Sequence, residues 1–295
     1  MKFGVTVPKK VEEAKLLDIE NGNNLRQKAI TKEHSKVIVA FMLLEDNKPL
    51  PVGSTKIPSH FIFDVKFDLT RKARLVTGGH RHKDTPVHSS YSSVVSIDSV
   101  IISFLLAALN DLDILAGDMG NAYLNASCKE KVHVIVKGDL FGPEHEGKRA
   151  VIVRALYGLK SAGNAWRHHL ANEIRNTLRC IPCKADQDIY MKPKTKNDGT
   201  TYYLHIVVYV DNILCIEENP KETMSRIGEI YRMKEDSVGP PRIYLGANIK
   251  KWNLQSEDRS ISQCWALSSE GYAIEAICIV SALMKKTQST IYLDT

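Results

Sequence analysis

The sequence predicts an α+β fold, because strand and helix patterns follow one another without the strict alternation of a βαβ fold. Residues 203–216 contain two apolar β runs, IVVYV and ILCI, separated by two polar residues. Residues 161–178 instead carry apolar side chains at helical spacing. The chain has 295 residues, of which 43% are hydrophobic and 25% are charged. This length and composition indicate about two globular units with a sizeable core.

The N-terminal part of the chain is expected to form two helices and a pair of strands. Residues 1–23 are polar and are expected to be a loose leader, whereas residues 24–41 begin with Asn and predict a helix. Alternating apolar residues predict a strand at 61–67, which a turn connects to a second strand at 73–77. Residues 94–109 predict a mostly buried helix, which is well short of the ~20 residues that cross a bilayer.

From residue 113 onward, strands and helices follow one another closely. Strands are expected at 113–118, 131–137, 150–154, 203–210, 213–216 and 244–251. A short helix or turn is expected at 120–127, and longer helices at 161–178, from Asn219 onward and at 272–286. This mixture extends the α+β prediction over the whole chain.

The charge balance is mildly basic. Lys and Arg number 40 against 34 Asp and Glu, which gives a net charge of +6 at neutral pH. Such a balance is compatible with a nucleic-acid partner but does not by itself indicate one. The six cysteines are too few for a disulfide scaffold, and no signal peptide is apparent. We therefore expect an intracellular protein, cytoplasmic or nuclear, with no membrane partner.

Two aspartates at expected strand ends are the first candidates for chemistry. Asp211 and Asn212 separate two β runs, and such a polar pair is typical of a tight hairpin turn, which needs no further role. Asp118 follows an apolar strand, where it can equally cap a helix at 119–126. Carboxylates at the ends of adjacent strands can also meet and hold Mg²⁺ together with substrate phosphates. The residues alone leave both interpretations open.

A series of motifs resembles one protein family. In chain order the motifs are KARLVTGGH (72–80), SSYSSVVSIDSV (89–100), AGDMGNAYLNA (116–126), ALYGLKSAGNAW (155–166), KADQDIYM (184–191), YVDN (209–212) and YLGANIK (244–250). Their order and spacing resemble the reverse transcriptase domain of copia-type LTR retrotransposons over residues 24–290. The LYGLK motif and the motif centred on YVD are highly specific in combination.

This resemblance implies a right-hand polymerase fold. Residues 24–112 would be mainly fingers, residues 113–251 mainly a ferredoxin-like palm with a fingers insertion, and residues 252–295 the start of the thumb. The implied activity is that of an RNA-directed DNA polymerase, a nucleotidyltransferase. Its implied partners are an RNA or DNA template with a primer, deoxynucleoside triphosphates and other parts of a retrotransposon polyprotein.

The resemblance also implies which residues bind metal and substrates. Asp118 and Asp211 would be catalytic carboxylates that, with a third acid, hold two Mg²⁺ ions, for which Mn²⁺ can substitute. The residues implied to bind the nucleotide are Lys72, Arg74, Tyr123, Gly158 and Lys160. The residues implied to support the primer end are Tyr244, Leu245 and Gly246.

Two of these implied roles have plainer alternatives. Tyr123 would exclude a ribose 2′-hydroxyl, but its spacing fits a packed helix aromatic equally well. The basic run at 66–83, which includes Lys72 and Arg74, would bind a polyanionic substrate, but a run of like charges is usually a solvated face.

One residue departs from the family pattern at the implied catalytic site. The family has Asp where this chain has Asn212, so the motif YVDD becomes YVDN and a full negative charge is lost. We therefore expect an impaired polymerase. The alternative is an inactive relic that acts at most as a nucleic-acid-binding module. Other enzyme classes lack support, because the sequence contains no GxGxxG, P-loop or HExxH motif.

Overall fold

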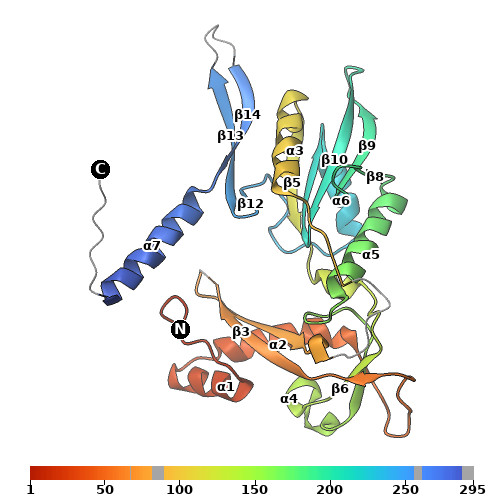
Figure 1. The fold of residues 1–295 in the computed structure, drawn as a ribbon, viewed down its shortest axis with the longest axis vertical. Coiled ribbons are helices and arrows are strands. Elements are labelled where there is room, and N and C mark those ends of the chain that lie inside the picture. Colours follow the sequence, from red (N-terminus) through yellow and green to blue (C-terminus); the bar gives the residue numbers. More distant parts are fainter. Residues whose placement is uncertain (67, 82–89, 256–260, 288–295) are drawn as a thin grey trace. The chain divides into compact units, whose positions relative to one another are not determined.

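The computed structural model describes residues 1–66, 68–81, 90–255 and 261–287, which form two compact units (Figure 1). Unit 1 comprises Met1–Ser93 and Asn121–Ile174, and unit 2 comprises Val94–Gly120 and Arg175–Thr295. Both units combine helices with sheets, which confirms the predicted α+β class. In the part of the chain that the structure describes, no helix is long and apolar enough to cross a membrane.

Unit 1 contains a four-stranded sheet, a separate hairpin and several helices. The sheet has the strand order β1-β7-β6-β2, and the hairpin joins β3 to β4. The strands are β1 (Phe41–Leu43), β2 (Thr55–Lys56), β3 (Ser59–Val65), β4 (Arg71–Thr77), β6 (Val132–Ile135) and β7 (Arg149–Ile152). The helices are α1 (Val11–Glu20), α2 (Leu25–Val37), α4 (Gly138–Phe141) and α5 (Ala162–Thr177), whose last turn belongs to unit 2. Short 3₁₀ turns lie at Ile38–Ala40, Gly79–Arg81, Ala122–Asn125 and Pro143–His145.

Residues 1–23, expected to be a loose leader, instead contain α1, which packs against α2. Asp18 of α1 is fully buried. Its carboxylate accepts hydrogen bonds from the backbone N–H groups of Arg26 (3.0 Å) and Gln27 (2.9 Å) and from the Arg26 guanidinium (3.1 Å). The prediction was wrong because it equated polar residues with exposed ones. Asp18 is buried because the next helix supplies a cation and two N–H donors.

Unit 2 is built on a five-stranded sheet with the strand order β5-β11-β10-β9-β8, in which all neighbours are antiparallel. The strands are β5 (Asp113–Asp118), β8 (Ile181–Pro182), β9 (Ile189–Thr195), β10 (Thr201–Tyr209) and β11 (Asn212–Glu217). Helices α3 (Ile97–Leu109) and α6 (Pro220–Ile230) pack on this sheet. A second sheet follows, made of β12 (Ile243–Tyr244), β13 (Ala247–Gln255) and β14 (Ile261–Ser268), and then α7 (Glu270–Thr287).

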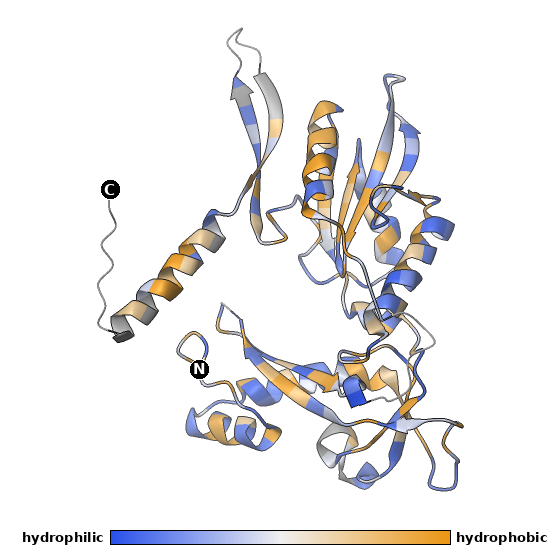
Figure 2. Cartoon of the chain, viewed as in Figure 1, coloured by the Kyte–Doolittle hydropathy of each residue, from blue (hydrophilic) through white to orange (hydrophobic). Residues whose placement is uncertain are grey.

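Helices α3 and α6 cover opposite faces of the five-stranded sheet. Phe104 of α3 belongs to the same buried cluster as Leu214 of β11. Gly117 of β5 pairs with Ile213, and a Cβ atom at Gly117 would lie 3.2 Å from the sulfur of Met224 in α6. Successive side chains of a strand point to opposite faces of the sheet. Leu214 therefore faces α3, and the neighbouring Ile213 faces α6. Figure 2 shows the resulting hydrophobic residues along α3 and the central strands.

Residues 244–251, expected to form one strand, form a hairpin instead. Leu245 and Gly246 make a two-residue turn between β12 and β13, with φ angles of 50° and 81°. Such a turn usually carries Asn-Gly or Asp-Gly. Because Leu stands at its first position here, the sequence continues an apolar strand pattern and does not indicate a turn. The strand β14, which pairs with β13, was not predicted.

Candidate active site

Asp118 and Asn212 lie opposite each other on two neighbouring strands of unit 2. Strand β5 ends at Asp118 and β11 begins at Asn212, and the antiparallel register pairs these residues directly. Asp211 lies in the β10–β11 turn, where its carbonyl oxygen accepts a hydrogen bond (2.7 Å) from the backbone N–H of Met119. The sheet therefore brings together the three residues that the sequence motifs assign to catalysis.

The turn at this site is shifted by one residue from its predicted position. Tyr209 pairs with Asn212, so the two turn residues are Val210 and Asp211 rather than Asp211 and Asn212. Asn212 is kept in β11 because it pairs with Tyr209 on one side and with Asp118 on the other. The turn therefore carries Asp211 at its tip, while Asn212 belongs to the sheet.

Lys234, which the sequence analysis did not identify, lies between the two aspartates. Its ammonium group contacts Oδ1 of Asp118 and lies 3.2 Å from Oδ2 of Asp211. The side chains are partly exposed, at 29% for each aspartate and 47% for the lysine. Lys234 is 116 residues from Asp118 in the chain, and no spacing pattern links a lone lysine in a polar loop to that strand end.

Backbone hydrogen bonds fix the loop that carries Lys234 to the end of β5. The N–H of Lys234 donates to the carbonyl oxygen of Asp118 (2.8 Å), and the N–H of Gly120 donates to that of Arg232 (2.8 Å). The Ser237 hydroxyl donates to the carbonyl oxygen of Lys234 (2.7 Å) and lies 3.3 Å from the backbone nitrogen of Asp118. The backbone of Lys234 is therefore held in place, while its side chain stays partly exposed.

Burial and charged neighbours shift two pKa values at this site. Partial burial raises the pKa of the Asp118 carboxyl above its ordinary value, Asp211 adds to the effect, and Lys234 opposes it. Partial burial disfavours the Lys234 ammonium, but its hydrogen bond to Asp118 and the charge of both aspartates outweigh this and raise the pKa of Lys234. Lys234 is therefore protonated at neutral pH and acts as a cation between the two carboxyl groups.

The oxygen donors at this site fit one divalent cation. Asp118 and Asp211 supply carboxylate oxygens, which Mg²⁺ prefers, and both already contact one cation, the Lys234 ammonium. Asn212 supplies only a neutral amide, whose N–H donates to Oδ1 of Asp211 (3.3 Å). Among the described residues, no group of three or more His, Cys, Asp or Glu side chains could hold a metal ion. The third carboxylate implied for a pair of Mg²⁺ ions is absent from this group.

In unit 1, the structure brings Arg74 and Tyr123 together around Tyr157, which the sequence analysis did not single out. The Arg74 guanidinium lies 5.9 Å from the centroid of the Tyr157 ring, and the ring centroids of Tyr123 and Tyr157 are 4.9 Å apart. Lys72 lies on the same face of β4 as Arg74, because side chains alternate along a strand and the residue between them is buried. Residues 67 and 82–89 of the predicted basic run and its flank lie outside the described part of the chain.

Gly158 lies in the loop between β7 and α5, here called the Tyr157 loop, at the point where this loop contacts the end of β4. Its φ angle is 93°, and a Cβ atom there would lie 2.0 Å from the carbonyl oxygen of Thr77. The N–H of Thr77 donates to the carbonyl oxygen of Tyr157 (2.8 Å), and the N–H of Gly79 donates to that of Gly158 (3.1 Å). Only glycine permits this approach, which sets the position of Tyr157. Lys160, two residues further on, is exposed.

The residues predicted to support a primer form the β12–β13 hairpin of unit 2. Tyr244 is buried, at 5% exposure, in the core cluster on the α3 face, and burial raises the pKa of its hydroxyl. Leu245 is partly buried and Gly246 is exposed in the turn. The tip of the turn is therefore exposed, whereas Tyr244 packs in the core beneath it.

Comparisons with known proteins agree with the motifs. A family model described as reverse transcriptase (RNA-dependent DNA polymerase) matches residues 46–257. The polyprotein of transposon TNT 1-94 from Nicotiana tabacum is 26% identical over 235 residues, which cover 76% of this chain and 16% of that protein. The Gag-Pol polyprotein of transposon Ty1-DR4 from Saccharomyces cerevisiae is 36% identical over 185 residues, which cover 61% of this chain and 10% of that protein.

A solved structure of a foamy viral protease-reverse transcriptase in complex with double-stranded DNA is also similar, at 13% identity and a TM-score of 0.44. That match covers 76% of this chain and 34% of the viral chain. The present chain spans only a small part of its polyprotein relatives, 16% of the TNT 1-94 protein and 10% of the Ty1-DR4 protein. The family model, by contrast, covers most of the chain, and both curated relatives come from transposons, as the motifs predict. The chain belongs to the reverse transcriptase (RNA-dependent DNA polymerase) family and is a domain of the copia type found in retrotransposon polyproteins.

Proposed function

We propose that unit 2 carries a nucleotidyl-transfer site that extends a primer 3′-hydroxyl on an RNA or DNA template. The observation that carries this proposal is that Asp118 at the end of β5 and Asp211 in the β10–β11 turn contact one ammonium group with their carboxylates. These two carboxylates would hold Mg²⁺, or Mn²⁺ in its place. A bound ion of this kind supplies positive charge to the attacking oxygen and the leaving pyrophosphate. The β10–β11 turn would keep Asp211 in place beside Asp118.

We propose that unit 1 corresponds to the fingers and that unit 2 corresponds to the palm with the start of the thumb. The second segment of unit 1, Asn121–Ile174, supports a fingers insertion within 113–251, although residues 94–112, expected to be fingers, belong to unit 2. In this assignment Lys72 and Arg74 would bind the triphosphate of the incoming nucleotide, with Arg74 supported by the Tyr157 ring. Tyr123 would contact the sugar, and Gly158 and Lys160 would line the same pocket.

We propose that Asn212 slows the reaction. Phosphoryl transfer depends on positioning and on neutralising the charge of the phosphates, and both require firmly held metal ions. An aspartate at this position would add a negative charge directly opposite Asp118 in the sheet. The Asn212 amide adds none, and its N–H donates to Oδ1 of Asp211, an oxygen that would otherwise be free to bind a cation.

Primer extension tests this proposal. We expect the wild-type chain to bind template–primer in Mg²⁺ but to extend it at least about a hundredfold more slowly than Asn212→Asp. Mn²⁺, whose geometry is less demanding, should recover part of the difference. Asp118→Asn in the Asn212→Asp background is the control and should abolish extension. Comparable extension by the wild type and Asn212→Asp would show that Asn212 is a tolerated ligand.

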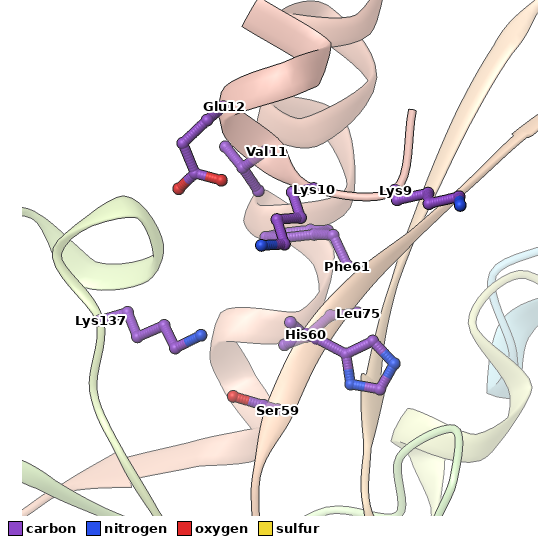
Figure 3. Close-up of a pocket in the computed structure, with 9 residues that line it drawn as sticks. All are labelled: Lys9, Lys10, Val11, Glu12, Ser59, His60, Phe61, Leu75 and Lys137. Carbon is purple, nitrogen blue, oxygen red and sulfur yellow. The ribbon is translucent and has the colours of Figure 1, made fainter. Parts of the chain in front are cut away.

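A second candidate function is binding of nucleic acid without catalysis, and a cavity in unit 1 favours it. The cavity has a volume of about 560 Å³. Its described lining residues include three lysines, Lys9, Lys10 and Lys137, and one acidic residue, Glu12. Figure 3 shows Lys10 and Lys137 reaching the hollow from different elements. Lysine side chains neutralise phosphates regardless of base sequence, so this group would suit a phosphodiester backbone.

The same extension experiment separates the two functions. Binding of template–primer by every variant, with no extension even by Asn212→Asp, would favour the binding-only function. Because the relatives are polyproteins of which this chain matches 16% or less, we also propose that other parts of such a polyprotein are its partners.

A further inference from the structure

We propose that Lys234 is a tethered counter-ion of Asp118 and Asp211, which a divalent cation must displace before it can bind this pair. Lys234 would thereby control the metal affinity of the site. The inference rests on the proposed function in one respect, since it takes Asp118 and Asp211 as the metal-binding pair. It concerns the protein before substrate binds, when the Lys234 ammonium contacts both carboxylates.

The first support is that hydrogen bonds hold the backbone of Lys234 at the end of β5. Its backbone N–H donates to the carbonyl oxygen of Asp118, the residue whose carboxylate its ammonium also contacts. The Ser237 hydroxyl holds the Lys234 carbonyl oxygen from the other side (2.7 Å). The side chain itself is 47% exposed, so it can swing into solvent while its backbone stays bound to β5. A cation tethered in this way keeps a high effective concentration at the carboxylates.

The second support is that donors from the chain already occupy both oxygens of Asp211. The Lys234 ammonium lies 3.2 Å from Oδ2, and the Asn212 amide donates to Oδ1 at 3.3 Å. Both contacts reduce the negative charge that Asp211 offers to a metal ion, and the Lys234 ammonium also repels a second cation that approaches Oδ2. Lys234 and Asn212 both lower the affinity of the site for a metal ion. Lys234 adds a positive charge beside the carboxylates, and the Asn212 amide occupies a lone pair of Asp211 Oδ1.

The third support is the charge of the group. Two carboxylates attract a divalent cation strongly, but an ammonium between them cancels half of that charge. Replacing Lys234 by a neutral side chain restores one unit of negative charge to the site. Replacing Asn212 by Asp adds one unit as well, at a neighbouring position. The two substitutions should therefore strengthen metal binding separately and most strongly together.

Binding of Mn²⁺ to the full chain, without primer or nucleotide, tests the proposal. The free ion is followed by its electron paramagnetic resonance signal. We expect Lys234→Met, which keeps an unbranched side chain one atom shorter but removes the charge, to bind Mn²⁺ at least about tenfold more tightly than the wild type. The control Lys234→Arg keeps the charge and should bind Mn²⁺ like the wild type. The double variant Asn212→Asp/Lys234→Met should bind it most tightly.

Three results would overturn the proposal, and they separate it from the proposed function. If Asn212→Asp strengthens Mn²⁺ binding but Lys234→Met does not, the counter-ion role is wrong and the metal site stands. If Lys234→Arg strengthens binding as much as Lys234→Met, the charge of Lys234 is not the cause. If no variant binds Mn²⁺, Asp118 and Asp211 are not a metal site, and the proposed function fails with the inference.

A melting experiment covers the case in which the substitution weakens the fold. Without metal, Lys234→Met leaves two carboxylates without their counter-ion and should melt at a lower temperature than the wild type. Mn²⁺ binds only the folded state and should raise the melting temperature of Lys234→Met more than that of the wild type. In Asp118→Asn/Lys234→Met this extra stabilisation should disappear. An equal response of Lys234→Met and the wild type to Mn²⁺ would contradict the proposal.

Discussion

Val210 occupies a backbone conformation that usually belongs to glycine. Its φ angle is 56°, and among the two turn residues Val210 and Asp211 only the first has a positive φ. Type II′ hairpin turns share this feature and prefer glycine at that position. A branched side chain in the left-handed region costs about 1–2 kcal/mol. The pairing of Asn212 with both Tyr209 and Asp118 holds the turn in this shape, next to the candidate metal-binding residue Asp211.

We predict that Val210→Gly stabilises unit 2. Glycine removes the steric cost of the positive φ but loses more backbone entropy on folding, which leaves a net gain of about 0.5–1 kcal/mol in the free energy of unfolding. Urea denaturation measures this gain. Val52→Gly is the matched control, because Val52 is 91% exposed and does not have a positive φ; it should lower stability slightly. A loss of stability in Val210→Gly would show that contacts of the valine side chain outweigh the strain.

His205 should make the stability of the chain depend on pH. It is 7% exposed in β10, and burial lowers its pKa below the ordinary value of 6.5. The unfolded chain then takes up the proton at a higher pH than the folded chain does. The stabilisation is present above about pH 6.5 and is lost as the pH falls toward the folded pKa.

We therefore expect the urea midpoint of the wild type to fall more than that of His205→Leu between about pH 7.5 and pH 5.5. His133, whose pKa burial also lowers, contributes in the same direction, so His133→Leu serves as a comparison that retains the His205 effect. If the wild type and His205→Leu respond equally to pH, His205 does not contribute.

At the scale of elements, the contact between β4 and the Tyr157 loop depends on glycine at position 158. Two backbone hydrogen bonds join the loop to β4 and to Gly79 just after it, and a Cβ atom at Gly158 would lie 2.0 Å from the Thr77 carbonyl oxygen. The same contact places the Tyr157 ring beside the Arg74 guanidinium and against Tyr123. A change at Gly158 should thus affect both the fold and the candidate nucleotide site.

We predict that Gly158→Ala lowers the free energy of unfolding by about 2–5 kcal/mol, because a positive φ and an overpacked Cβ atom add their costs. It should also weaken nucleotide binding. Gly199→Ala is the matched control, since Gly199 has a φ of 89° but nothing within 4 Å of its added Cβ atom. It should lose only about 1–2 kcal/mol and bind nucleotide normally. Equal losses in urea denaturation would show that the Tyr157 loop moves away without cost.

At the scale of the whole molecule, the net charge of +6 favours a polyanionic partner, and the position of the charges decides where it binds. We predict that Lys72→Glu/Arg74→Glu weakens binding of template–primer. Each lost phosphate contact should reduce the slope of log affinity against log salt by about 0.7–0.9. Fluorescence anisotropy over a series of salt concentrations measures both effects.

Lys15→Glu/Lys28→Glu is the matched control for this prediction. It changes the net charge equally at exposed positions of α1 and α2 and should have the smaller effect. Unchanged binding by Lys72→Glu/Arg74→Glu at low salt would show that this part of β4 is only a solvated face.

The sequence by itself determined the strands that carry the candidate site and their family. The apolar run of β5 stops at Asp118, and the structure confirms the predicted strand 113–118 to the residue. Local patterns suffice there, because a short apolar run and its polar ends are properties of neighbouring residues. The predicted position of the β10–β11 turn was wrong by one residue. Local patterns could not give it, because the pairing of Asn212 with Asp118 in a distant strand determines where the turn lies.

The tertiary structure alone decided which charges meet. Asp18 is buried against Arg26, and the Lys234 ammonium reaches Asp118 from 116 residues away. The strength of an ion pair depends on the distance between the charges and on their burial. The residues next to a charged side chain in the sequence do not indicate which partner it will meet. For this reason the aspartates of the site were predictable from motifs, whereas the lysine between them became visible only once the loop at Lys234 was folded onto the end of β5.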